Sequence, residues 1–226
     1  MDIEANLREY LYGIGRTQGV MPTERYASFD YCFNYFQSFR EQGRLEALAN
    51  VEHLQTSCLQ LGFYLASWGM LRGSAFLLGK SVKFYERLVV TIVGTAPDLW
   101  AIDVDTYTPN NIKLILECKR QFVESLGRAN SPSDTLVSKI MLGVFGNVPA
   151  FDLNFKTGFG VSTFGKQALE KVANFYETHK AVVDKYRVPT LDFATGQSTH
   201  RQYTRAKVVD MVFFIQGGKK SNDLAT

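Results

Sequence analysis

The sequence predicts an all-α protein, and two observations lead to this fold class. Apolar side chains recur at spacings of three and four residues along most of the chain, which is the period of an amphipathic helix. No segment keeps the strict alternation of apolar and polar residues that indicates a sheet. The 226 residues, 46% hydrophobic and 13% aromatic, are enough for one large core or for two lobes of about 100 residues each.

The N-terminal half has the clearest helical periodicity. Residues 3–14 form a short amphipathic segment, and a second helix is expected over 23–41, after Pro22. In 51–70 one apolar face recurs at spacings of four, three, four and three, and it consists of Leu54, Cys58, Leu61, Leu65 and Trp68. Segment 81–94 predicts a further helix, although its β-branched run "LVVTIV" is also compatible with a buried strand.

Capping residues mark two helices in the middle of the chain. A helix over 108–127 should begin at a Thr-Pro pair and end at a glycine. Ser133 or Asp134 can cap the next helix, which runs to Phe145.

The C-terminal part should hold two more helices. A glycine-rich link over 156–165 precedes a long helix over 166–186, and a last helix covers roughly 201–216. We expect about eight to ten helices in total. The expected organisation is a helical lobe over 1–128, a second lobe over 129–217 and a flexible tail over 218–226.

Composition favours a cytoplasmic protein without a membrane segment. The longest apolar runs, such as "MVFFI", fall far short of the ~20 residues that a membrane span requires. The first ten residues contain acids and no hydrophobic core, so we expect no secretory signal. The cysteines Cys32, Cys58 and Cys118 are widely spaced and predict neither a disulfide framework nor a metal site.

Several kinds of catalytic chemistry lack a motif in this sequence. We find neither a phosphate-binding glycine loop nor a nucleophile elbow. His53, His179 and His200 are far apart, so no metal site forms from local spacing. We therefore expect no metal and no cofactor, and any catalysis would use carboxylates or a lysine.

One acid stands in an apolar setting. In "SKIMLGVFGNVPAFDLNF", residues 138–155, the helix breaks at Gly146 and the chain turns through Pro149 to reach Asp152. The neighbours of this acid are Val148, Phe151, Leu153 and Phe155. Two interpretations stay open, namely a reactive carboxylate and a structural acid that caps the turn.

The segment "TLVSKIMLGVFGNVPAFDLNF" resembles the helix and following loop of the helix-hairpin-helix DNA glycosylases, the group of endonuclease III and the adenine-mismatch and 8-oxoguanine glycosylases. In that family an apolar helix ends in a glycine step, and a Val-Pro or Phe-Pro pair precedes the catalytic Asp, often with Asn or His two positions later. Here these features fall on Phe145-Gly146, Val148-Pro149, Asp152 and Asn154. The resemblance implies a two-lobed helical glycosylase-like fold in which Asp152 is the catalytic carboxylate.

The hairpin before this helix departs from the family. The family usually has L-P-G-V-G, whose glycines let backbone amides approach a phosphate, whereas this chain has "ANSPSDT", a degenerate hairpin. The resemblance then implies DNA contacts from the helix start, at Ser133 and Thr135, and from Asn154 and Lys156. The family's lysine nucleophile corresponds most nearly to Lys139, which sits one turn late. A monofunctional enzyme is therefore implied.

A glycosylase also needs a pocket for the extruded base. Breaking an N-glycosidic bond builds positive charge on the sugar, which a desolvated carboxylate stabilises while it orients water. The base itself enters a pocket with flat walls. The stretch "GFYLASWGMLRGSAF" offers Tyr64, Trp68, Arg72 and Ser74 as a pocket wall, although aromatic residues at this spacing more often form a core. Arg72 either contacts a ligand or pairs with a buried acid, for which the candidates are Asp103, Asp105 and Asp210.

Basic residues are concentrated near the C-terminus. Residues 151–226 hold 11 Lys/Arg against 7 Asp/Glu, whereas 1–150 hold 14 against 15. This asymmetry is compatible with a polyanionic partner or with an ordinary solvated face. The stretch "HRQYTRAK" supplies a candidate DNA-backbone patch of His200, Arg201, Arg205 and Lys207. Asp210, within "KVVDMVFFI", is predicted to accept hydrogen bonds from a buried partner.

Three functions remain open. The first is a DNA glycosylase that hydrolyses the bond to a flipped modified base, such as hypermodified cytosine in phage DNA, and leaves an abasic site; it would bind DNA as a monomer. The second is a noncatalytic helical component of a bacterial defence or toxin system that binds nucleic acid or protein. The third is an α-helical small-ligand regulator, which would show no salt-dependent DNA binding.

Overall fold

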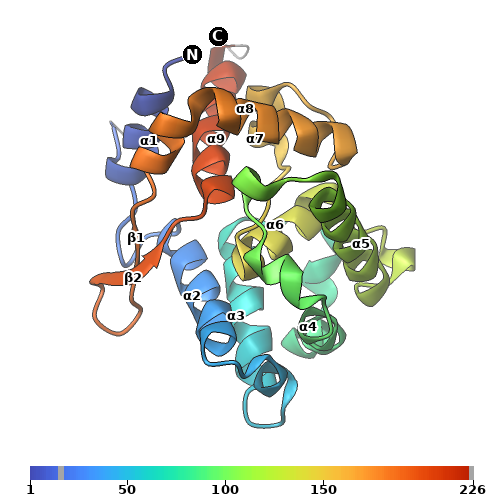
Figure 1. Ribbon diagram of the computed structural model, residues 1–226. Coiled ribbons are helices and arrows are strands. Elements are labelled where there is room, and N and C mark those ends of the chain that lie inside the picture. The colour runs from blue at the N-terminus through green and yellow to red at the C-terminus, as the bar shows by residue number, and fades with distance from the viewer. Residues whose placement is uncertain (15–17, 224–226) are drawn as a thin grey trace.

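The protein is mostly helical in its computed structural model, which confirms the all-α class (Figure 1). The structure describes residues 1–14 and 18–223. Within them lie nine α-helices, six short 3₁₀ helices and one antiparallel pair of strands. The elements are α1 (Ile3–Tyr12), α2 (Ala27–Glu41), α3 (Leu54–Ser67), α4 (Glu86–Val93), α5 (Pro109–Ser125), α6 (Asp134–Phe145), α7 (Leu153–Phe159), α8 (Lys166–Lys185), β1 (Pro189–Leu191), β2 (Ser198–Gln202) and α9 (Arg205–Asp223).

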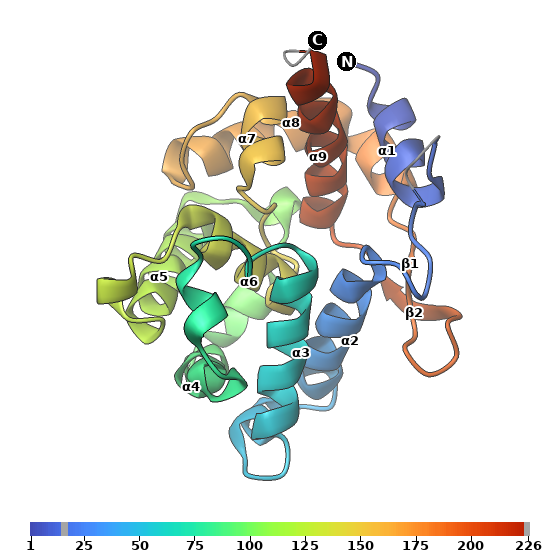
Figure 2. The same cartoon turned by 180° about the vertical axis from the view of Figure 1, so that it is seen from behind.

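The helices form two groups (Figures 1 and 2). Helices α1, α7, α8 and α9 lie at one end of the molecule, and α2 to α6 lie at the other. Helix α9 packs against α1, α7 and α8, whereas α6 packs against α2, α3 and α5. The first helix of the chain thus joins the C-terminal helices. The division into lobes over 1–128 and 129–217 stays a prediction.

Local capping interactions begin and end the central helices as predicted. The Thr108 hydroxyl oxygen accepts the backbone N–H of Asn111 at 3.2 Å at the start of α5. The Ser133 hydroxyl oxygen accepts that of Leu136 at 3.2 Å at the start of α6. Helix α6 ends at Gly146, whose φ of 68° lies in the left-handed region that glycine favours.

Other boundaries settle or correct the sequence predictions. The segment 81–94 contains a 3₁₀ turn and α4, so the helical alternative is confirmed. Helix α2 begins at Ala27, four residues later than predicted. The glycine-rich link over 156–165 was wrong in its first part, because α7 occupies it. Asp152 caps α7, and Gly160 ends it in the left-handed region with a φ of 71°.

The beginning of the last predicted helix was also wrong. Residues 201 and 202 belong to β2, which pairs with β1 in a hairpin. Helix α9 begins only at Arg205. The Asp103 carboxylate fixes this start, because it accepts the backbone N–H groups of Arg205 and Ala206 at 2.8 and 2.9 Å.

The end of α9 is helical where the sequence predicted a flexible tail. Neighbouring helices hold this part, as Lys219 shows: its Nζ lies 2.8 Å from a carboxylate oxygen of Glu9 on α1. Residues 224–226 of the predicted tail lie outside the described residues. Helix α7 also crosses α9 very closely, since a Cβ added to Gly158 or Gly217 would collide with the backbone of the opposite helix.

The α7–α9 contact predicts that alanine substitutions at two adjacent glycines have opposite effects on stability. Gly217→Ala should lower the free energy of unfolding by about 1–3 kcal/mol, because the added methyl group meets backbone atoms that cannot move aside alone. Gly218→Ala is the matched control, since nothing lies within 4 Å of its added Cβ. It should stabilise the helix by up to about 1 kcal/mol. Urea unfolding of both variants measures this, and equal effects would contradict the close crossing.

A buried acid holds the hairpin against α2. The Asp30 carboxylate accepts the backbone N–H of Leu191 and the hydroxyl of Tyr203, both at 2.8 Å. Burial raises the pKa of Asp30 to about 7, although the Leu191 and Tyr203 hydrogen bonds and the charge of Lys207 oppose this rise. The protonated form is therefore favoured in the fold relative to the unfolded chain, where an aspartate titrates near 4.

The raised pKa of Asp30 makes stability depend on pH. Its stabilising contribution is complete below about pH 4 and is lost as the pH rises through about 7. Asp30→Asn imitates the protonated form and removes this dependence. Urea unfolding from pH 5 to 8 should show wild-type protein losing up to about 3 kcal/mol relative to the variant. Parallel pH curves for the two proteins would show that the Asp30 pKa is ordinary.

Candidate functional site

A small enclosed cavity lies where the two helix groups meet. Residues from α3, α6, α9 and the segment before α7 form its walls, and its volume is about 10 Å³, close to the minimum for one water molecule. The polar and aromatic members of the wall are Tyr64, Trp68, Lys139, Asp152, Lys207, Asp210 and Phe214. Two carboxylates and two lysines therefore face one confined space.

The Asp152 carboxylate makes two interactions within the protein. One carboxylate oxygen accepts the backbone N–H of Phe155 at 2.9 Å and caps α7. The other lies 3.3 Å from the Nζ of Lys139, and only 14% of the Asp152 side chain is exposed. The capping role that the sequence left open is thus present, and the same carboxylate also belongs to a nearly buried ion pair.

Lys139, on α6, connects this helix to α3 at the cavity wall. Its Nζ donates to the carbonyl oxygen of Trp68 at 3.0 Å, at the end of α3. Its own carbonyl oxygen accepts the hydroxyl of Tyr64 at 3.1 Å. The structure therefore brings together the two residues predicted to be catalytic, Lys139 and Asp152.

A second ion pair faces the same cavity. The Nζ of Lys207 lies 3.2 Å from Asp210 and donates to the Tyr10 hydroxyl at 2.8 Å. The other Asp210 oxygen accepts the backbone N–H of Ala150 at 3.0 Å, which confirms the predicted buried role of this acid. Burial lowers the pKa of Lys207 and raises that of Asp210, while the attraction between the two charges opposes both shifts.

Aromatic rings enclose the lysines. Trp68 stacks on Tyr26 with 5.5 Å between ring centroids, and Tyr26 stacks on Tyr10 at 4.3 Å. Phe214 meets Trp68 edge-on at 5.6 Å. The Nε1 of Trp68 is buried and has no hydrogen-bond partner among the described residues. Since Tyr26 covers one face of Trp68, the predicted stacking of a base on this ring requires a rearrangement.

The structure places two of the four residues of the predicted base pocket at this cavity. Tyr64 and Trp68 line the cavity, but Arg72 and Ser74 lie in the exposed segment after α3. Arg72 also has none of the acidic partners considered for it. Asp103 and Asp105 pair instead with Arg205, and Asp210 pairs with Lys207.

The predicted DNA-backbone patch is largely engaged inside the protein. Arg201 makes a bidentate pair with Glu41, at 2.7 and 2.6 Å. Arg205 lies 2.9 Å from Asp184. His200 is exposed but also faces Glu41. The prediction for Lys207 was wrong, because only 1% of this residue is exposed.

The helix start at α6 is likewise occupied. Thr135 donates its hydroxyl to the carbonyl oxygen of Phe151 at 2.9 Å, and the Ser133 hydroxyl caps the helix. Asp134 adds a negative charge there, paired with Lys119 at 2.6 Å. Both hydroxyls predicted to contact a phosphate, those of Ser133 and Thr135, are therefore engaged within the protein. The Lys119 charge beside them is paired with Asp134.

The remaining predicted contacts lie on α7. Asn154 packs against α9 at Gly217, so part of it is unavailable to DNA. Lys156 lies at a shallow surface hollow of about 580 Å³, beside Lys171. Among the predicted DNA contacts, Lys156 is therefore the residue whose position best suits contact with DNA.

Sequence reasoning missed the Lys207–Asp210 pair as part of the site. Its signal was present, because a lysine and an acid three residues apart within an apolar helical run share one face of the helix. Tyr10 and Arg25 were missed because they come from distant segments. The guanidinium of Arg25 lies 5.5 Å from the Trp68 ring.

Comparisons with models of protein families, with curated proteins and with solved structures found no match. Residues 1–14 and 18–223 contain no cluster of three or more His, Cys, Asp or Glu that could hold a metal ion. The described helices include none that is long and apolar enough to cross a membrane.

The second ion pair predicts strong coupling between its members. Lys207→Met or Asp210→Asn alone should lower the free energy of unfolding by about 3–5 kcal/mol, because each leaves a buried charge unpaired. The double variant should recover much of this loss. A double-mutant cycle measured by urea unfolding tests the coupling. The exposed pair Lys83–Glu86 is the control and should couple far more weakly, whereas equal coupling would contradict the description.

Proposed function

We propose that the protein is a monofunctional DNA glycosylase with the two-lobed helical fold of that superfamily and a degenerate helix-hairpin-helix. It would hydrolyse the N-glycosidic bond of a flipped modified base, such as hypermodified cytosine in phage DNA, and leave an abasic site. The observation that carries the proposal is the nearly buried Asp152 carboxylate, paired with Lys139 at a cavity between the two helix groups. The proposed setting is the cytoplasm, with DNA as partner.

Asp152 has the properties that the reaction requires. The sugar gains positive charge as the glycosidic bond breaks, and a carboxylate in a poorly solvated site stabilises that charge strongly. The bond to the Phe155 amide fixes the orientation of the carboxylate. The same group can orient a water molecule towards the sugar.

The contacts of Lys139 support a monofunctional reaction. Its Nζ is held by the Trp68 carbonyl oxygen and by Asp152, so the amine is not directed at a substrate carbon. In this proposal Lys139 positions Asp152 and does not form a covalent intermediate. The cavity is smaller than a base, so DNA binding must move the wall at Trp68, together with Tyr26, which stacks on that ring.

The decisive variant is Asp152→Asn. Asparagine caps helices about as well as aspartate, so α7 keeps its start while the charge is lost. Base release should fall by at least about 100-fold. The measurement is alkali-revealed strand cleavage at abasic sites, on single- and double-stranded DNA and on phage genomes with modified cytosines. Asp2→Asn, which changes the cap of α1, is the matched control and should retain full activity.

Stability is measured in the same experiment, because Asp152→Asn leaves Lys139 without its anion. The double variant Lys139→Met/Asp152→Asn removes both charges and should also be inactive. Wild-type activity in either folded variant would exclude Asp152 as the catalytic carboxylate.

The internal pairing of the basic residues favours a second candidate, a noncatalytic helical protein that binds nucleic acid or protein. Arg201 pairs with Glu41 and Arg205 pairs with Asp184, so these two predicted contacts are not free for a DNA backbone. This candidate predicts ligand binding without base release, and Asp152→Asn would then leave binding unchanged.

A further inference from the structure

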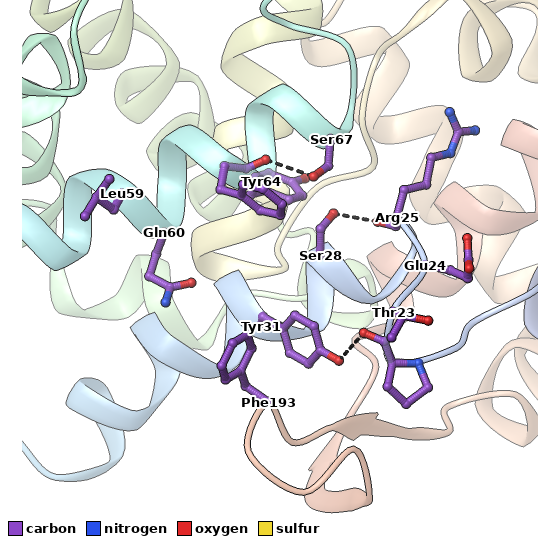
Figure 3. A pocket seen from close by; sticks show the side chains of 12 residues that line it. Thr23, Glu24, Arg25, Ser28, Tyr31, Leu59, Gln60, Tyr64, Ser67 and Phe193 are labelled. Carbon is purple, nitrogen blue, oxygen red and sulfur yellow. Dashed lines mark hydrogen bonds between the residues drawn. The ribbon is translucent and has the colours of Figure 1, made fainter.

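An open pocket of about 700 Å³ lies beside the enclosed cavity (Figure 3). Helices α2 and α3 form its floor, the segment before α2 forms one side, and the tip of the β1–β2 hairpin forms another. Tyr64 lines both this pocket and the enclosed cavity. The two spaces are thus neighbours that share one lining residue.

Exposed aromatic rings line this pocket. Phe63 is 72% exposed and Phe193 is 77% exposed, although both are large apolar side chains. Tyr31 meets Phe193 edge-on with 5.1 Å between centroids, and its hydroxyl is fixed by donation to the Pro22 carbonyl oxygen at 2.7 Å (Figure 3). Exposed apolar surface gathered at a concave site is typical of a ligand site.

Two polar groups of the pocket have unused hydrogen-bonding capacity. In the part of the chain that the structure describes, the Arg25 guanidinium makes no ion pair or hydrogen bond, and it lies over the rings of Tyr26 and Trp68. The Gln60 amide has no hydrogen-bond partner there either. The hydroxyls of Ser28 and Ser67 donate to backbone carbonyl oxygens, so their oxygen atoms remain free to accept.

We infer that this pocket binds a nucleobase, a flat heteroaromatic ring that stacks on Phe63 and Phe193 and presents its polar edge to Arg25 and Gln60. An apolar peptide would bury these two polar groups without partners, which is unfavourable. A small inorganic anion would leave the aromatic rings uncovered. The volume lies within the range of about 300–1,000 Å³ for small-molecule sites, so a base with its sugar fits.

The inference goes beyond the proposed glycosylase reaction, because the pocket is open to solvent and contains neither Asp152 nor Lys139. The base has two sources, an unpaired base in a nucleic acid strand or a free nucleotide. The test therefore measures fluorescence anisotropy of fluorescein-labelled oligo-dA, oligo-dC and oligo-dT 12-mers, with the matching nucleoside monophosphates as competitors. Competition at similar concentrations identifies a free nucleotide, and binding of the strand alone identifies nucleic acid.

Phe63→Ala and Phe193→Ala should each weaken binding about tenfold, because each removes a stacking surface. Both side chains are exposed, so the fold should persist, and circular dichroism checks this. Tyr12→Ala on α1 is the matched control, since Tyr12 is also 72% exposed and lies outside the pocket. Its binding should equal that of wild type.

Two results would overturn the inference. One is wild-type protein that binds neither the strands nor the monophosphates, and the other is equal affinity of wild type and both phenylalanine variants. The outcome is separate from that for base release. Binding that depends on Phe63, without abasic sites on any DNA, would uphold this pocket and reject the glycosylase proposal.

Discussion

The carboxylate of Asp210 is the constraint on which the site depends. It accepts the Ala150 amide with one oxygen and pairs with Lys207 through the other, so it ties α9 to the segment that leads into α7. That segment delivers Asp152 to the first position before α7. The close crossing of α7 and α9 at Gly158 and Gly217 then fixes the other end of the same helix. The position of Asp152 is therefore set by contacts with distant helices, namely α9 through Ala150 and α6 through Phe151.

Two nearly buried ion pairs at one cavity are costly to assemble. Each charge loses hydration, and its partner restores only part of that loss, so apolar residues of similar size would often be as stable. Here each lysine also contacts the Trp68 ring, with centroid distances of 5.6 Å for Lys139 and 5.3 Å for Lys207. Four ionisable groups lie together where the two helix groups meet. Such clusters are more typical of a reactive site than of a purely structural core.

The sequence predicted what local interactions decide. Helices α5 and α6 followed from Thr108 and Ser133, whose capping partners lie three residues away. The hairpin could not be found in this way, because its anchors are distant in the chain: Asp30 holds Leu191, and Thr190 bonds to Asn34. Helix α7 was missed as well, because its second half, from Lys156, falls in the segment that the glycines predicted to be a link.

The site was predictable to a similar extent. The apolar setting of Asp152 identified an unusual acid, and the structure brought Lys139 to it. The basic C-terminal residues were predicted as a DNA patch, but several of them pair with acids within the protein. A sequence does not distinguish a solvated arginine from one paired with an acid far away in the chain, as Arg201 is with Glu41. Burial of Lys207 similarly depends on Tyr10 and Phe29, whose rings its Nζ approaches to 4.7 Å.

The most direct measurement is a mass-spectrometric search for free bases in the small-molecule fraction after wild-type protein is incubated with DNA that contains modified cytosines. Cleavage of the N-glycosidic bond at the Asp152 site predicts one free base for each abasic site, and the mass identifies the base. If the folded protein binds the DNA but no free base is released from any of the DNAs tested, the glycosylase proposal is contradicted. Asp152 would then serve only as the cap of α7.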